Sequence, residues 1–89
     1  MYTDRMRKKH YYMLTFSTTH DAISAEKVLG EHLPVAVMPT LRQVSASCGI
    51  SLRVEEENWP KLAGIAWERE RSVPYYVGET VEKADWPTE

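Results

Sequence analysis

The pattern of hydrophobic and polar residues predicts a strand followed by a helix in the first third of the chain. Residues 10–17 are dense in aromatic side chains and indicate a first strand. A helix is expected directly afterwards, because Thr18 or Thr19 can cap it and Gly30 and Pro34 bracket its end. Its apolar positions recur at three- and four-residue spacing, at Ala22, Ala25, Leu29 and Leu33.

The remaining pattern predicts three more strands and a second helix. Residues 35–39 form a short apolar run that ends at a proline, and residues 49–57 alternate between apolar and polar side chains. Residues 58–71 indicate a helix, because an asparagine can cap it and a proline stands in its first turn. Residues 73–82 are expected to form the fourth strand.

The element order β-α-β-β-α-β predicts an α+β fold, the ferredoxin-like sandwich, in which both helices cover one face of an antiparallel sheet. Five aromatic side chains favour a covered face on the other side as well: Tyr11, Tyr12, Tyr75, Tyr76 and Trp67. We expect residues 1–9 to be a flexible basic arm, residues 10–82 a single domain and residues 83–89 an acidic tail.

Size and charge narrow the range of partners. The 89 residues carry a net charge of −2, which argues against nucleic-acid binding, since phosphate contacts need clustered Lys and Arg. The charge is uneven, with seven basic and four acidic residues in 1–53 but four basic and nine acidic in 54–89.

No apolar stretch is long enough to cross a membrane, so no membrane partner is expected. A domain of this size builds a modest core, which leaves a homodimer as an option.

The chain has one cysteine, Cys48, in the segment SASCG. A single cysteine cannot form an internal disulfide, so the cytoplasm is the expected location. No carboxylate lies between Glu31 and Glu55 in the sequence, and Arg42 and Arg53 are the charged residues of that window. Such surroundings favour a thiolate.

The neighbours of the cysteine point in the same direction. Ser45 and Ser47 add hydroxyl donors, and Gly49 allows backbone N–H groups to turn toward an anionic sulfur. The opposite interpretation is an inert, buried cysteine, which is the common state of a free thiol. The residues by themselves leave these two interpretations balanced.

Other kinds of site find little support. The three histidines are scattered and there is no second cysteine, so no metal is expected, and the separated glycines do not form a phosphate loop, so no cofactor is expected. His20, just inside the first helix, could face the loop before the third strand, although a solvated or capping histidine is the simpler account. Arg42 could equally be a surface residue.

Two motifs resemble those of the small selenium/sulfur carrier-like proteins, over about residues 11–70. The first consists of Ala22, Glu26, Lys27 and Leu29 on the predicted helix, and the second of Pro39, Arg42, Ser45, Cys48 and Gly49. Family members often have a proline where this chain has Leu41, which makes the loop less rigid here. The resemblance implies that Cys48 accepts sulfur or selenium as a persulfide or perselenide.

The leading hypothesis is therefore a carrier that works between two other proteins, and not a self-sufficient enzyme. The resemblance implies a cysteine-desulfurase-type donor and a downstream acceptor protein. In this hypothesis Cys48 is the attacking thiolate, Arg42 and Arg53 stabilise the anion, and Ser45, Ser47 and Gly49 shape the pocket. The alternative is a non-catalytic regulatory or protein-interaction module with a structural cysteine.

Overall fold

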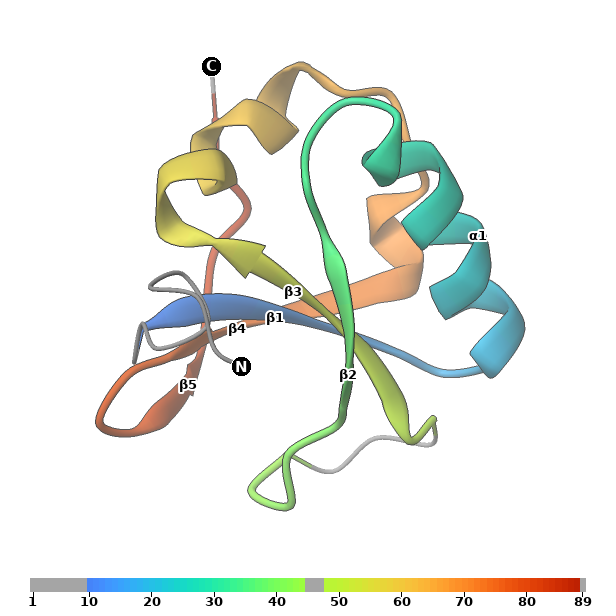
Figure 1. The fold of residues 1–89 in the computed structure, drawn as a ribbon. Helices are drawn as coiled ribbons and strands as arrows, with labels where there is room; N and C mark the ends of the chain where they lie inside the picture. Colours follow the sequence, from blue (N-terminus) through green and yellow to red (C-terminus); the bar gives the residue numbers. More distant parts are fainter. Residues whose placement is uncertain (1–9, 45–47, 89) are drawn as a thin grey trace, which may run out of the picture.

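A computed structural model describes residues 10–44 and 48–88 (Figure 1). The regular elements are β1 (Tyr11–Phe16), α1 (Thr19–Gly30), β2 (Ala36–Pro39), β3 (Ile50–Glu55), the 3₁₀ helices η2 (Glu56–Gly64) and η3 (Arg69–Arg71), β4 (Ser72–Val77) and β5 (Val81–Lys83). The strands form one sheet in the order β2-β3-β1-β4-β5, and each neighbouring pair is antiparallel. The predicted α+β class with an antiparallel sheet is confirmed. The basic arm expected over residues 1–9 lies outside the described residues.

The predicted second α-helix over residues 58–71 is wrong. This part of the chain forms η2 and η3, with an irregular segment between them. Trp59 and Leu62 are both buried, and a spacing of three residues places them on one side of a 3₁₀ helix, which repeats every three residues. The same spacing is compatible with an α-helix, which is why the sequence pattern was ambiguous here.

The predicted fourth strand over residues 73–82 is a hairpin. The chain leaves β4 at Val77, turns through Gly78 and Thr80, and returns as β5. The turn is closed by a hydrogen bond from the Gly78 N–H to the Thr80 carbonyl, at 2.9 Å. The sheet therefore has a fifth strand, and β5 in place of β4 forms its edge.

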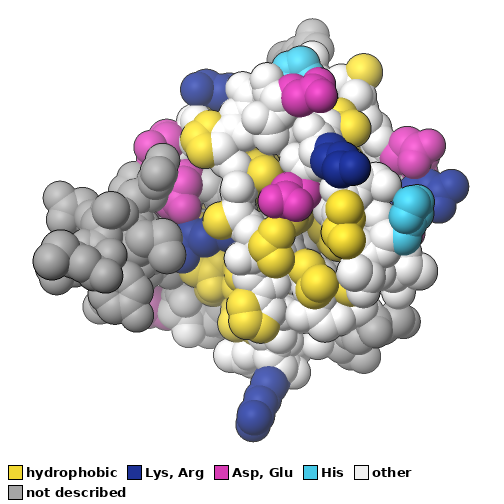
Figure 2. Space-filling model, turned by 45° about the vertical axis from the view of Figure 1, so that its right-hand side comes forward, with side chains coloured by type: hydrophobic (Ala, Val, Ile, Leu, Met, Phe, Trp, Pro, Cys, Tyr) yellow, Lys and Arg dark blue, Asp and Glu magenta, His cyan; other side chains and the backbone are white. Residues whose placement is uncertain are grey.

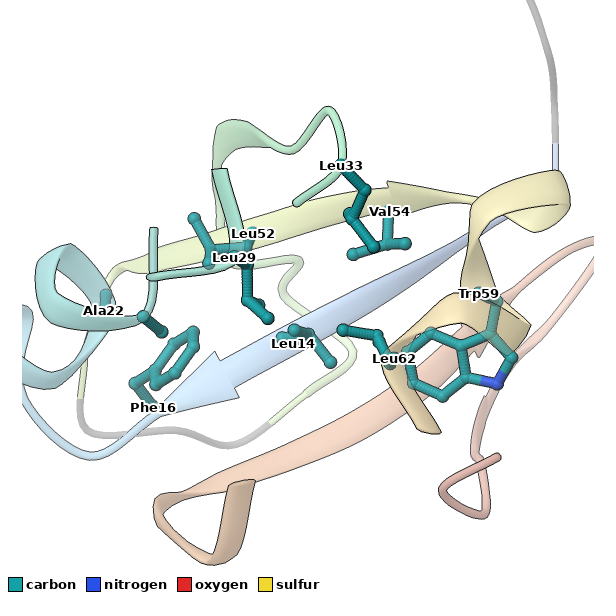
Figure 3. Close-up of a cluster of buried hydrophobic side chains, with 10 residues drawn as sticks. Leu14, Phe16, Ala22, Leu29, Leu33, Leu52, Val54, Trp59 and Leu62 are labelled. Carbon is teal, nitrogen blue, oxygen red and sulfur yellow. The ribbon is translucent and has the colours of Figure 1, made fainter. Parts of the chain in front are cut away.

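The main core lies between the sheet and the layer formed by α1 and η2 (Figure 3). Leu14 of β1 is fully buried at its centre, with Leu29 approaching from α1 and Leu62 from η2. The other buried members are Phe16, Ala22, Ala25, Leu33, Leu52, Val54 and Trp59. Both helical segments thus cover one face of the sheet, as the helical layer of the predicted sandwich does.

A smaller core covers the other face of the sheet. Met13 of β1 is fully buried there, and it packs with Val77 of β4 and with Val44 from the connection between β2 and β3. Tyr11 and Tyr75 pack around this second cluster, whereas Tyr12 packs against the main core. The alternation of side chains along each strand therefore divides the tyrosines between the two faces.

A chain of stacked aromatic rings ties the C-terminal residues to the main core. Tyr12 stacks on Trp59 with ring centroids 4.0 Å apart, and Trp59 stacks in turn on Trp86 at 5.7 Å. Trp67 meets Trp86 edge-on at 5.4 Å. Tyr76 meets the edge of Tyr12 at 5.0 Å and donates its hydroxyl to Glu56. These contacts pack the partly buried Trp86 against the main core despite its position beyond the last strand.

Thr40 fixes the point at which the chain leaves β2 and re-enters the sheet at β3. Its backbone N–H donates to the Gly49 carbonyl at 2.9 Å, and its hydroxyl donates to the Cys48 carbonyl at 3.0 Å. The hydroxyl of Ser51, which is fully buried, lies 2.6 Å from that of Thr40. Since the Thr40 proton is used for Cys48, Ser51 donates to Thr40. Thr40 thereby holds the backbone of Cys48 in place.

We expect Thr40→Val to destabilise the protein by about 1–3 kcal/mol, because it leaves the buried Ser51 hydroxyl without its partner. Urea unfolding measures this free energy. Thr80→Val is the matched control, since the Thr80 hydroxyl donates to Glu82 on the surface. Equal losses in the two variants would contradict the role given to Thr40.

The pKa of Tyr76 is raised to about 12, first by its 2.7 Å hydrogen bond to Glu56 and then by burial and by the charge of Glu56. A raised pKa means that the interaction stabilises the fold fully below about pH 10 and is lost as the pH rises through about 12.

We expect Glu56→Ala to lower the pKa of Tyr76 toward 10.0. Tyrosinate absorbance, taken as a difference against Tyr76→Phe, measures it. Glu82→Ala should leave this pKa unchanged, and an equal shift there would contradict the assignment.

Candidate functional site

Cys48 lies just before β3 and is a free, buried cysteine with 4% of its surface exposed. Two polar groups of the described residues contact its sulfur. The backbone N–H of Ile50 donates to Cys48 Sγ at 3.4 Å, and the hydroxyl of Thr19 lies 3.6 Å from it. The thiol is therefore enclosed between the first turn of α1 and the first residue of β3.

The way α1 begins explains why Thr19 is available to the thiol. Thr18 is the N-cap, and its side chain accepts the backbone N–H of Asp21 at 3.1 Å. Thr19 is then the first helical residue, and its hydroxyl faces Cys48. The sulfur therefore lies between the Ile50 N–H and the end of α1 that carries partial positive charge.

A carboxylate from outside the carboxylate-free window of the sequence lies in the first turn of α1. Asp21 belongs to the same helical turn as Thr19, two residues further along. Its carboxylate pairs with Arg71, with Oδ1 3.6 Å from Nη1, and Arg71 also contacts Glu68 at 3.1 Å. The charge of Asp21 near the start of α1 is thus partly offset by a cation from the segment that precedes β4.

The structure separates the predicted supporting residues. Ser45 and Ser47 lie outside the described residues. Arg42 is exposed, in a turn closed by a hydrogen bond from the Val44 N–H to the Leu41 carbonyl at 3.1 Å. Its role in the site stays a prediction.

The role expected for Gly49 beside the thiol stays a prediction. Gly49 has no positive φ, and the N–H that reaches the sulfur belongs to the next residue, Ile50. What Gly49 contributes is its carbonyl, which accepts the backbone N–H of Thr40.

Arg53 lies on the face of the sheet opposite α1. It pairs with Met13 in the register of β1 and β3, and its Nε donates to Glu55 Oε2 at 2.7 Å. Its guanidinium stands over the ring of Tyr11, 4.1 Å from the centroid. The structure brings Arg53 to these groups and not to the sulfur of Cys48, which faces α1.

His20 points into a hollow of about 570 Å³ between α1 and residues 66–71. Asp21 and Arg71 line the same hollow. On the α1 side of the molecule, hydrophobic side chains gather in the middle of the face, with acidic and basic side chains interspersed (Figure 2). The residue of the first turn of α1 that contacts Cys48, in the loop before β3, is Thr19.

Sequence reasoning missed Thr19 and Thr40 as parts of the site. The signal for Thr19 was present in the pair Thr18-Thr19, because one threonine suffices as a cap and the other is then free for a different contact. The signal for Thr40 was weaker, since a threonine after Pro39 gives no indication of its partners 8 and 11 residues away.

Over residues 10–44 and 48–88, no group of three or more His, Cys, Asp or Glu residues is placed to hold a metal ion. The helices of the same residues are too short or too polar to cross a membrane.

Comparison with known proteins gives one match. No curated protein and no solved structure matches the chain. A family model does, and it covers residues 11–75, from the start of β1 into β4 and through every residue that contacts Cys48 in the described structure. Because this match covers well over half of the sequence, the chain belongs to the family described as "Putative Se/S carrier protein-like".

Proposed function

We propose that this protein carries sulfur or selenium on Cys48 as a persulfide or perselenide. The Cys48 thiolate attacks the outer sulfur of a persulfide on a cysteine-desulfurase-type donor, and a new bond forms between the two sulfur atoms. The bond between the donor's two sulfurs breaks, and the donor leaves as a thiolate. A nucleophile of the acceptor protein then attacks the outer atom and releases the Cys48 thiolate. Neither transfer needs an oxidant or reductant.

The observation that carries this proposal is the placement of Cys48 Sγ between the Ile50 N–H and the first turn of α1. A thiolate and a terminal persulfide are both anions, and both are stabilised by hydrogen-bond donors and by the amino end of a helix. The match of the chain to the Se/S carrier-like family supports the same chemistry.

One observation favours a second candidate. With 4% of its surface exposed, Cys48 has the burial of a structural cysteine, and its contacts with Thr19 and Ile50 also tie α1 to β3. A regulatory or protein-interaction module would need such a tie and no reaction. A carrier, by contrast, must uncover the sulfur when its donor binds, so the two candidates differ in whether the folded protein reacts.

Loading of the folded protein tests the proposal. We expect incubation with a cysteine desulfurase and cysteine to add one sulfur atom to the protein by intact mass, and a parallel incubation with selenocysteine to add one selenium atom. Cys48→Ser is the matched control, because it keeps the size and polarity of the side chain, and it should gain neither atom. An unmodified wild type, or the same gain in Cys48→Ser, would overturn the proposal and favour the module.

The Thr19 hydroxyl gives a second prediction. We expect Thr19→Val to slow alkylation of Cys48 by iodoacetamide in the folded protein roughly three- to tenfold, because one hydrogen bond to the sulfur is lost. Thr19→Ser keeps the hydroxyl and should react at nearly the wild-type rate. Mass spectrometry follows the reaction, and rates in denaturant, where the variants should agree, provide the reference. A Thr19→Val variant as fast as wild type would show that this hydroxyl does not assist the sulfur.

A further inference from the structure

The two edges of the sheet differ in charge. β5 forms one edge, and it carries Glu82 and Lys83. β2 forms the other, and residues 33–41, which contain it, have no charged side chain. Charged residues on an edge strand, lysine above all, prevent pairing with another chain. The β5 edge has this protection and the β2 edge lacks it.

The β2 edge also presents backbone groups that can pair. Thr40, just after β2, donates its backbone N–H to the carbonyl of Gly49, just before β3, so these two residues are a hydrogen-bonded pair. Along an antiparallel pair of strands, hydrogen-bonded and non-hydrogen-bonded pairs alternate. The backbone groups of Met38 and Ala36 therefore point toward β3, while those of Val37 point away from the sheet. No strand of the described residues lies on that side of β2 (Figure 1).

The side chains along this edge are apolar and open. Val37 is 53% exposed, the highest value among the large hydrophobic residues identified as exposed. A hollow of about 350 Å³ runs beside β2, lined by residues 34–39 together with Arg53 and Glu55. Those two charges neutralise each other through their 2.7 Å contact, so the hollow adds no net charge to the edge.

We propose that β2 pairs with β2 of a second copy of this chain, antiparallel and centred on Val37, to join two sheets into one. Each Val37 would exchange both backbone hydrogen bonds with its copy. Pro39 has no N–H, but in this register it faces Val35 of the copy and can accept that residue's N–H through its carbonyl. The proposal does not depend on the chemistry of Cys48.

The absence of charged side chains along β2 favours a second copy of this chain as the partner of this edge. In a twofold interface the residues at the axis face their own copies, so a charge near Val37 would lie close to a like charge. The uncharged residues 33–41 avoid this. An interface of one short strand is smaller than a standard protein interface, so we expect a dissociation constant on the order of 0.1 mM.

Sedimentation equilibrium of the full chain at concentrations up to about 1 mM tests the proposal. We expect the average mass to rise toward that of a dimer. Val37→Lys should weaken association at least about tenfold, because it places two charges at the axis. Val73→Lys is the matched control, since Val73 is a strand valine with 39% exposure on β4, and it should associate like wild type.

Amide hydrogen exchange of the unmodified chain provides a readout that needs no variant. The Val37 N–H should exchange more slowly as the protein concentration rises, while the amides of β5 should not change. A monomer throughout the concentration range would overturn the proposal and leave the edge to a strand from another protein. Equal association of Val37→Lys and Val73→Lys would place the interface elsewhere and overturn it too.

Discussion

Burial on both faces of β1 is the constraint on which the rest of the structure depends. Met13 and Leu14 are neighbours in the chain and point to opposite faces of the sheet, yet both are fully buried. A sheet of this kind needs cover on each side, and with fewer than 100 residues there is material for one helical layer. α1 and η2 provide that layer over Leu14. The cover over Met13 includes the connection that follows β2, through Val44.

This second cover determines where the thiol lies. Val44, in the connection that follows β2, packs against Met13 on this face of the sheet, and β3 begins six residues later. Thr40, directly after β2, joins the two ends of this connection through its hydrogen bonds to Gly49, Cys48 and Ser51. Cys48 is consequently the residue at which the chain re-enters the sheet, beside the first turn of α1. The packing of Val44 against Met13 and the position of the Cys48 sulfur thus both depend on the connection between β2 and β3.

Local signals explain which parts of this could be predicted from the sequence. α1 was predictable because its cap and its apolar spacing both lie within the segment, and β3 because its side chains alternate strictly. η2 was not, since a three-residue spacing of Trp59 and Leu62 fits two kinds of helix. Arg53 was assigned to the thiol from its nearness in sequence, although alternation with Leu52 and Val54 already placed it on the other face. The contact between Thr19 and Cys48 joins residues 29 positions apart, and no local pattern encodes it.

The aromatic cluster has a consequence for how this molecule can be observed. Of its three tryptophans, Trp59 and Trp86 stack beside Tyr12 of β1, whereas Trp67, which meets Trp86, also lines the hollow beside the first turn of α1. Cys48 meets Thr19, which follows the opposite end of the same strand. Intrinsic fluorescence therefore reports on η2 and the C-terminal residues and, through Trp67, on the first turn of α1. A probe attached to the sulfur itself would separate opening of the chain around Cys48 from a movement of α1, which tryptophan emission alone reports together.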